Sequence, residues 1–256
     1  MASFDFSLQG KVALVTGGSR GIGKATALGF ARVGADVVVA SRGLSDLEKV
    51  AEEIRGLGRR SLAVAAHVGR LEQINDLVSK VSDEFGRIDI LVNNAGTSPG
   101  MIRAMDVDER FWDSIMNLNL KGLFFLSQTV AKVMREHGGG RIINVSSVAG
   151  FKPESSVGTY AISKAGVIVA TRVMAREWAQ YNIRVNAIAP GYVRTRLTES
   201  LFTVLPGYEG VLLDRTPLGR IAEPDEMVGA MIYLASDASS FMTGETMIVD
   251  GAISLT

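Results

Sequence analysis

Short apolar runs alternate with longer segments of helical periodicity along almost the whole chain, and this alternation constrains the fold most. The runs are apolar on both strand faces, as happens when helices cover both sides of a sheet. The expected fold is therefore α/β, a doubly wound parallel sheet with helices on both faces. We predict strands at 12–15, 37–40, 62–66, 88–92, 142–145, 184–188 and 246–249, and helices at 21–33, 45–57, 71–85, 108–136, 158–180 and 224–236.

No linker or low-complexity segment interrupts the alternation, so we expect a single domain over residues 1–256. The least regular stretch is 192–220, where Pro206, Gly207, Gly210 and Pro217 interrupt a mixed run. Irregular stretches of this length inside a compact domain are commonly functional loops. We predict that this stretch leaves the sheet and forms a mobile lid.

Composition excludes several classes of function. The 27 basic residues balance the 27 acidic ones, so no electrostatic surface for nucleic acid or an anionic membrane is expected. The chain has no Cys and two His, which argues against disulfides, thiolate chemistry and a metal site. No signal peptide, peroxisomal address or apolar run of about 20 residues is present. We expect a cytoplasmic protein without a membrane, nucleic-acid or metal partner.

A glycine-rich turn joins the first predicted strand to the first predicted helix, in the sequence Thr16-Gly-Gly-Ser-Arg-Gly-Ile-Gly23. Glycines at this position allow a tight turn and let the backbone approach a pyrophosphate, which then lies at a helix N-terminus. The spacing Gly17-x-x-x-Gly21-x-Gly23 differs from the Gly-x-Gly-x-x-Gly of many dinucleotide sites. Its position after the first strand predicts a nucleotide site.

The end of the second predicted strand bears on cofactor choice. NAD sites place an acidic residue here for the ribose hydroxyls, whereas this chain has Ser41 followed by Arg42. A second guanidinium, that of Arg20, lies within the glycine turn. Arginine pairs bidentately with phosphate, so the two residues favour a 2′-phosphate and hence NADP(H). Two unrelated surface arginines are the alternative.

Tyr160 and Lys164 lie four residues apart in a predicted helix, and therefore on the same helical face. A phenol has a pKa of about 10, and a nearby cation favours its charged form. The pair therefore predicts a tyrosine that donates or accepts a proton near neutral pH. Among the five Tyr of the chain, Tyr160 alone has Lys at this spacing.

These motifs occur together with Asn93-Asn-Ala-Gly96 after the fourth predicted strand and Asn186-Ala-Ile-Ala-Pro-Gly191 after the sixth. In this combination the chain resembles the short-chain dehydrogenase/reductase family over essentially its whole length. The resemblance implies a Rossmann-type sheet, NADP(H) and hydride transfer between the cofactor and a carbonyl or alcohol group. It also implies a homo-oligomer, commonly a tetramer.

The resemblance assigns catalytic roles residue by residue. Tyr160 is expected to be the general acid in carbonyl reduction, and Lys164 to lower its pKa and bind the nicotinamide ribose. Ser147, thirteen residues before Tyr160, is expected to hold the substrate oxygen, with Ser146 as the alternative. Asn119 is expected to position a water that relays protons to Lys164, with Asn117 as the alternative.

The same resemblance predicts the cofactor-binding residues. His67 and Val68 stand where most members have Asp-Val, and an imidazole nitrogen can still accept a hydrogen bond from adenine. A purely structural His67 is the alternative. The full predicted set is Gly17, Ser19, Arg20, Gly21, Ile22, Gly23, Ser41, Arg42, His67, Val68, Asn94, Ala95, Gly96, Tyr160, Lys164, Pro190, Gly191, Val193 and Thr195.

The substrate is less constrained. The expected walls of its pocket are 97–99, 148–155, 192–197 and the lid, and they are mainly apolar, which favours a hydrophobic ketone or aldehyde. Arg194 and Arg196 are interpreted as solvent-facing. The sequence His67-Val-Gly with Ala40-Ser-Arg42 is similar to the NADP-dependent carbonyl reductase branch. Alternatives are a 3-oxoacyl-thioester reductase, a sugar-acid or secondary-alcohol dehydrogenase, and a catalytically silent nucleotide sensor or scaffold.

Overall fold

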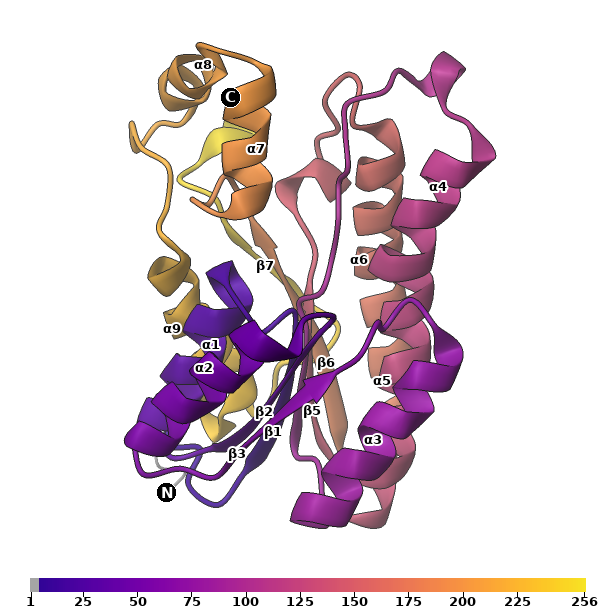
Figure 1. Ribbon diagram of the computed structural model, residues 1–256, viewed down its shortest axis with the longest axis vertical. Helices are drawn as coiled ribbons and strands as arrows, with labels where there is room; N and C mark the ends of the chain where they lie inside the picture. The colour runs from indigo at the N-terminus through magenta and orange to yellow at the C-terminus, as the bar shows by residue number, and fades with distance from the viewer. Residues whose placement is uncertain (1–4) are drawn as a thin grey trace.

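One parallel sheet runs through the middle of the molecule in the computed structural model, which describes residues 5–256 (Figure 1). Its strand order is β3-β2-β1-β4-β5-β6-β7, and every pair of neighbours is parallel. The bounds lie within two residues of those predicted. The strands are β1 Val12–Thr16, β2 Asp36–Ser41, β3 Ser61–Ala65, β4 Ile90–Asn93, β5 Gly140–Val145, β6 Ile183–Pro190 and β7 Thr246–Val249.

Helices cover both faces of this sheet, as predicted (Figure 1). One side carries α1 (Gly21–Arg32), α2 (Leu44–Gly56) and α9 (Val228–Ala235). The other side carries α3 (Leu71–Phe85), α4 (Glu109–Met116), α5 (Leu123–Glu136) and α6 (Gly158–Trp178).

Alternation along each strand supplies two hydrophobic cores, because successive side chains of a strand point to opposite faces. In β1, Val12 and Leu14 join the core beneath α3, α5 and α6, whereas Ala13 and Val15 join the core beneath α1, α2 and α9. All four are 5% exposed or less. The apolar runs of the sequence are therefore strands buried on both faces.

The long helix predicted at 108–136 is interrupted. A π-helical segment, Asn117–Gly122, separates α4 from α5. It passes so close to the loop after β3 that a Cβ on Gly122 would lie 2.1 Å from the Val68 carbonyl oxygen. Such π segments within helices are frequently found at functional sites. This one carries Asn119.

The predicted lid, 192–220, is an excursion from the sheet but is more regular than its sequence indicates. It contains α7 (Arg196–Val204) and α8 (Tyr208–Arg215), which lie beyond the carboxyl end of the sheet (Figure 1). Pro206, Gly207 and Pro217 fall outside both helices, whereas Gly210 lies within α8. Gly207, at a φ of +85°, forms the sharp turn between α7 and α8.

The order of the strands fixes where a ligand site can form. From β1 the chain crosses to β2 and β3 on one side, and then returns to β4 on the other. Ligands of doubly wound folds bind in the crevice at such a switch point, outside the carboxyl ends of the strands. No helix within residues 5–256 has both the length and the apolar character to cross a membrane.

Candidate active site

Tyr160 and Lys164 lie in the first two turns of α6 and face the carboxyl end of β5. The Lys164 Nζ donates a hydrogen bond to the Val145 carbonyl oxygen at 2.8 Å and lies 5.6 Å from the centre of the Tyr160 ring. Lys164 is 4% exposed, and burial lowers its pKa to about 8. The lysine is therefore an ammonium at neutral pH, but one that loses its proton unusually easily.

The expectation that Lys164 lowers the pKa of Tyr160 is wrong for this structure. Burial raises the pKa of the Tyr160 phenol, and the effect that opposes the rise is a hydrogen bond with the Ser147 side chain. Desolvation disfavours a phenolate, and the ammonium is aimed at a backbone carbonyl rather than at the phenol oxygen. Tyr160 is accordingly a protonated donor at neutral pH.

The two neighbouring serines directly follow β5 and make different contacts. Ser146 is 2% exposed and its hydroxyl donates to the Lys164 carbonyl oxygen at 2.8 Å. Ser147 lines a cavity together with Tyr160, and its Oγ accepts from the Ala149 amide at 3.1 Å. The tertiary structure thus brings Ser147, and not Ser146, to the phenol.

Asn119 is buried within the π-helical segment and bridges two parts of the site. Its side-chain amide donates to the Thr97 carbonyl oxygen at 2.9 Å and to Ser163 Oγ at 3.1 Å, while its Oδ1 accepts from the Thr97 amide at 2.8 Å. A Cβ on Gly96 would meet Asn119 Oδ1 at 3.4 Å and Lys164 Nζ at 3.5 Å. Both polar atoms therefore border the same space beside Gly96. Asn117 opens the segment, and only Asn119 has these contacts.

The backbone of the glycine-rich turn is held by a side chain from the loop after β4. Asn94 Nδ2 donates to the carbonyl oxygens of Thr16 and Gly17 at 3.0 and 3.2 Å. A Cβ on Gly23 would lie 2.3 Å from the Gly17 oxygen, so this position admits glycine alone. The helix α1 then begins at Gly21 with no side chain capping its first amides. Those amides are available to an anion.

Asn93 is placed differently from its neighbours. Its side chain is 4% exposed and donates to Ser127 Oγ and Asn144 Oδ1 inside the core, so it cannot line a ligand site. Asn94 and Ala95 are partly exposed and Gly96 is exposed at the crevice. The predicted stretch 93–96 therefore reaches the surface only from Asn94 onward.

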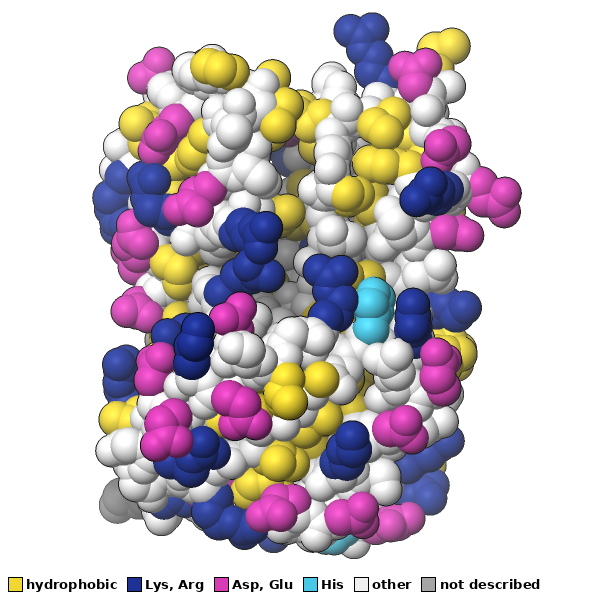
Figure 2. All heavy atoms as spheres, in the orientation of Figure 1, with side chains coloured by type: hydrophobic (Ala, Val, Ile, Leu, Met, Phe, Trp, Pro, Cys, Tyr) yellow, Lys and Arg dark blue, Asp and Glu magenta, His cyan; other side chains and the backbone are white. Residues whose placement is uncertain are grey.

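Basic side chains gather beside the ends of β2 and β3. Arg20 and Arg42 are exposed, and Ser41 is partly exposed. Burial is the main cause of the lowered pKa of His67, and the positive charges of Arg42 and Arg70 lower it further. Both guanidinium groups therefore lie near the imidazole. Figure 2 shows Lys and Arg side chains and a His side chain around a hollow at the centre of this face. Arg70 was not predicted from the sequence.

The hydrogen bonding of His67 decides its tautomer. Its Nδ1 accepts from the Gly69 amide at 3.1 Å, and its lowered pKa keeps the ring neutral at pH 7. The remaining nitrogen, Nε2, must therefore carry the proton. In this arrangement Nε2 is a hydrogen-bond donor and Nδ1 is taken by the Gly69 amide, and the contact of His67 with adenine stays a prediction.

The predicted residues after β6 lie against the glycine turn. Thr195 Cγ2 lies 3.2 Å from the Cβ position of Gly21. Val193 is buried and pairs with Ala222 in an isolated bridge, and a Cβ on Gly191 would meet the Asp250 backbone at 2.8 Å. The segment from Pro190 to Thr195 therefore runs along the crevice beside α1. Among the other predicted residues, Ile22 packs on the core and Val68 is buried.

A cavity of about 250 Å³ adjoins Ser147 and Tyr160. Its walls include apolar side chains from the loops after β4 and β5 and from the lid, in agreement with the predicted walls. From the predicted walls, Tyr192, Leu197, Leu201 and Tyr208 line it, whereas Phe151, Pro153, Phe202 and Leu205 do not.

The cavity also contains charged side chains that sequence reasoning missed. Lys152, Glu154 and Arg215 line it, whereas Arg194 lies outside, paired with Glu209 at 3.0 Å and Glu223 at 3.4 Å. The position of Glu154, between Ser147 and Tyr160 in the sequence, was a usable signal. Nothing in the sequence pattern points to Arg215.

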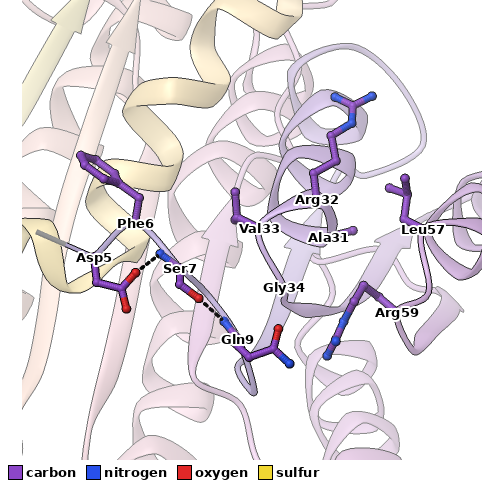
Figure 3. Close-up of a pocket in the computed structure, with 10 residues that line it drawn as sticks. All are labelled: Asp5, Phe6, Ser7, Gln9, Ala31, Arg32, Val33, Gly34, Leu57 and Arg59. Atoms are coloured by element: carbon purple, nitrogen blue, oxygen red, sulfur yellow. Dashed lines mark hydrogen bonds between the residues drawn. The ribbon is translucent and has the colours of Figure 1, made fainter.

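A larger hollow lies elsewhere and is unrelated to this chemistry. It measures about 580 Å³ and is formed by the chain before β1, the end of α1 and the turn after α2 (Figure 3). Figure 3 shows Asp5, Ser7 and Gln9 hydrogen-bonded in sequence along one side of it. None of the predicted site residues borders this hollow.

Comparison with known proteins agrees with the fold and the motifs. A family model described as enoyl-(acyl carrier protein) reductase matches residues 17–254. The structure of a short-chain type dehydrogenase/reductase from Mycobacterium marinum is 39% identical, with a TM-score of 0.92 and 97% of each chain covered. The chain belongs to the short-chain dehydrogenase/reductase family. It is an oxidoreductase of the CH–OH and C=O groups, as its named relatives are.

Two further members of the short-chain dehydrogenase/reductase family are informative. The 2-dehydro-3-deoxy-D-gluconate 5-dehydrogenase of Escherichia coli (strain K12) is 44% identical over 252 residues, 96% of each chain. The structure of a gluconate 5-dehydrogenase from Burkholderia cenocepacia J2315, in complex with NADP and tartrate, is 36% identical, with a TM-score of 0.93 and 98% of each chain covered.

Proposed function

We propose that the protein is an NADP(H)-dependent oxidoreductase that reduces a ketone or aldehyde to an alcohol, with Tyr160 as the proton donor. The observation that carries this proposal is that Tyr160 and Ser147 line one cavity, with the buried ammonium of Lys164 directly behind them. A carbonyl that accepts hydride develops negative charge on oxygen, which needs hydrogen-bond donors and then a proton. Ser147 supplies a donor, and the protonated Tyr160 supplies both.

The glycine turn fits the dinucleotide. The crowding around Gly23 and the free amides at the start of α1 make a cradle that a phosphate can approach and that a larger residue would fill. When bound there, the cofactor supplies or takes up the hydride. Gly17, Ser19, Gly21, Asn94 and Thr195 are the residues that we expect to hold it.

The preference for a 2′-phosphate is supported by the basic cluster. Arg20 and Arg42 are exposed beside the turn, and Arg70 adds a further cation near His67. The NADP complex of the Burkholderia relative is consistent with this choice. No carboxylate stands at Ser41 to repel the phosphate. We therefore assign NADP(H) rather than NAD(H).

Asn119 and Lys164 are proposed to serve the proton supply. Both polar atoms border the space beside Gly96, and Asn119 Oδ1 uses one lone pair on Thr97, which leaves a second for a water molecule. Lys164, with a pKa of about 8, can give up and regain a proton near physiological pH. The proposed route runs from Lys164 through water to solvent.

The surface of α5 and α6 bears on assembly. Exposed apolar side chains lie along α5 and α6, on Phe125, Ile162, Val169 and Val173. Faces of this kind mark protein interaction sites. We propose a cytoplasmic homotetramer that pairs these helices.

The test is NADPH consumption against a panel of carbonyl compounds. The panel includes an apolar ketone, because much of the cavity wall is apolar. It also includes a keto form of a sugar acid and a 3-oxoacyl thioester, because named relatives act on these two classes. Turnover of at least one ketone or aldehyde is expected. A chain that binds NADPH and turns over none would instead be the silent nucleotide sensor.

A sugar-acid dehydrogenase is the second candidate, and a specific observation favours it. The cavity that contains Ser147 and Tyr160 also carries Lys152, Glu154 and Arg215. A purely apolar substrate would take water away from the paired charges of Glu154 and Arg215 and offer no hydrogen bond in return, which is costly. The assignment to the carbonyl reductase branch stays a prediction.

A further inference from the structure

The Glu154 carboxylate is the centre of a polar cluster in the wall of the substrate cavity. Its Oε2 accepts from the hydroxyls of Tyr208 at 2.9 Å and Tyr192 at 3.2 Å, and its Oε1 lies 2.7 Å from Arg215 Nη2. All four residues line the cavity that also contains Ser147. We call Glu154, Tyr192, Tyr208 and Arg215 the polar corner.

The polar corner joins three parts of the chain. Glu154 lies in the loop between β5 and α6, after Ser147 in the same loop and before Tyr160 in α6. Tyr192 follows β6. Tyr208 and Arg215 are the first and last residues of α8, seven positions apart and thus on one helical face. The corner is therefore attached both to the reacting groups and to the lid.

Charge keeps the corner in one hydrogen-bonding state. Burial and the neighbouring Glu154 carboxylate raise the pKa of Tyr192, and burial and the hydrogen bond to Glu154 raise that of Tyr208. Both phenols therefore stay protonated and donate to the carboxylate. The carboxylate in turn raises the pKa of Arg215, which stays a guanidinium. The corner thus carries one ion pair and two neutral phenols.

Hydrogen-bonding capacity remains after these contacts. A carboxylate offers about four acceptor sites, and a phenol that donates still has lone pairs to accept with. Arg215 has five N–H groups, and its side chain is 37% exposed. The corner can therefore accept from one ligand group and donate to the next. Adjacent hydroxyl groups of a polyol match this pattern, because each hydroxyl both donates and accepts.

The size of the cavity limits what can reach the corner. At about 250 Å³ it lies just below the usual range for small-molecule sites, so a substrate that fills it is compact. A long acyl chain would extend outside it, and a short alkyl ketone would leave Glu154 and Arg215 facing hydrocarbon.

We infer that Glu154, with Tyr208 and Arg215, is the specificity-determining group of the site and selects a compact, polyhydroxylated carbonyl substrate through hydroxyl groups remote from the reacting carbon. This inference rests on the proposed function, because it concerns the same cavity. Tyr160 acts on the carbonyl, and the polar corner holds the other end of the molecule.

The experiment compares two ketones with the same four-carbon skeleton, erythrulose and butanone, which differ only in hydroxyl groups. NADPH consumption by the wild-type enzyme is expected to show a kcat/KM for erythrulose at least about tenfold above that for butanone, since a site built to bind hydroxyls disfavours an analogue without them.

Two variants locate this preference. Glu154→Gln keeps the shape of the side chain and is expected to raise the KM for erythrulose about tenfold or more, with butanone changed less than about threefold. Tyr208→Phe removes a single hydroxyl and is expected to give a smaller rise in the same direction. The matched control is Glu209→Gln, on the same helix, whose carboxylate pairs with Arg194 outside the cavity. The control is expected to leave the KM for both ketones unchanged.

The outcomes separate the possible roles. An equal loss with both ketones in Glu154→Gln, or butanone preferred by the wild type, overturns the inference while the proposed function stands. An equal loss with both ketones would mean that Glu154 only holds the lid in place and does not select the substrate. If Glu154→Gln fails to fold in a thermal melt, Tyr208→Phe decides by the same criterion. Absence of turnover with every carbonyl compound overturns both the inference and the proposed function.

Discussion

The crevice beside the glycine turn and the cavity beneath the lid are built by different means. The turn is shaped by backbone atoms, such as the Gly17 oxygen that lies 2.3 Å from the Cβ position of Gly23. The cavity is shaped by side chains from distant parts of the sequence, such as Tyr208 and Glu154, 54 residues apart. We call these the cofactor side and the substrate side.

This difference explains what each side can recognise. Backbone amides at a helix start bind any phosphate, so the cofactor side suits a ligand common to many enzymes. Side chains can change without disturbing the sheet, so the substrate side can be adapted to one molecule. Tyr160 and Lys164 lie where the two sides meet. Substitutions on each side should therefore fail in different ways.

The largest expected effect is at the junction. Tyr160→Phe keeps the ring and removes only the hydroxyl, which is the proposed proton donor. It should therefore lower kcat by about 10²–10⁴-fold or more. The affinity for NADPH, measured by fluorescence titration, should stay nearly unchanged. Retained turnover in this variant would remove Tyr160 from the mechanism.

The next effect tests the cofactor side. Gly23→Ala places a methyl group against the Gly17 oxygen and should weaken NADPH binding by about 100-fold, or prevent folding, because backbone atoms cannot yield cheaply. The control is Gly56→Ala at the end of α2, where a Cβ meets nothing within 4 Å. The control should be neutral or slightly stabilising. Normal NADPH affinity in Gly23→Ala would contradict a backbone-built cofactor side.

A smaller effect concerns the choice of cofactor. Arg42→Ala should weaken NADPH binding by about 10–100-fold, the worth of a charge-assisted hydrogen bond, and leave NADH binding unchanged. Arg32→Ala, on the exposed surface beside the hollow of Figure 3, serves as the control. Parallel losses for both cofactors in Arg42→Ala would argue against a 2′-phosphate contact.

The smallest effect is on stability as a function of pH. Burial lowers the pKa of Lys164 to about 8 from 10.5, so between these values the folded chain binds fewer protons than the unfolded chain. The contribution of Lys164 to the free energy of unfolding therefore rises with pH across that window. Below pH 8 the folded chain carries the cost of desolvating the Lys164 ammonium. Chemical denaturation of wild type and Lys164→Met from pH 7 to 10 should show the wild type gaining about 1–3 kcal/mol relative to the variant. A constant difference would show that Lys164 keeps an ordinary pKa when folded.

Much of the cofactor side could be predicted from the sequence because its signals are local. The glycines lie between a strand and a helix, and the four-residue spacing of Tyr160 and Lys164 is one helical turn. The seven strands were found by their apolar runs for the same reason. The roles of the individual site residues stay predictions until they are measured.

The tertiary structure decided what depends on burial and on contacts between distant residues. Burial, with Lys164 turned to the Val145 carbonyl, set the direction of the Tyr160 pKa against expectation. The Gly69 amide set the tautomer of His67, and the contact of Ser146 with the Lys164 carbonyl left Ser147 as the serine that lines the cavity.

The sequence by itself therefore determined the sheet, the nucleotide turn and the paired Tyr160 and Lys164, because each depends on residues within a turn or a strand of one another. The polar corner around Glu154 was decided only by folding. Its carboxylate meets Arg215 because α8 lies against the loop between β5 and α6, and no local periodicity encodes that approach.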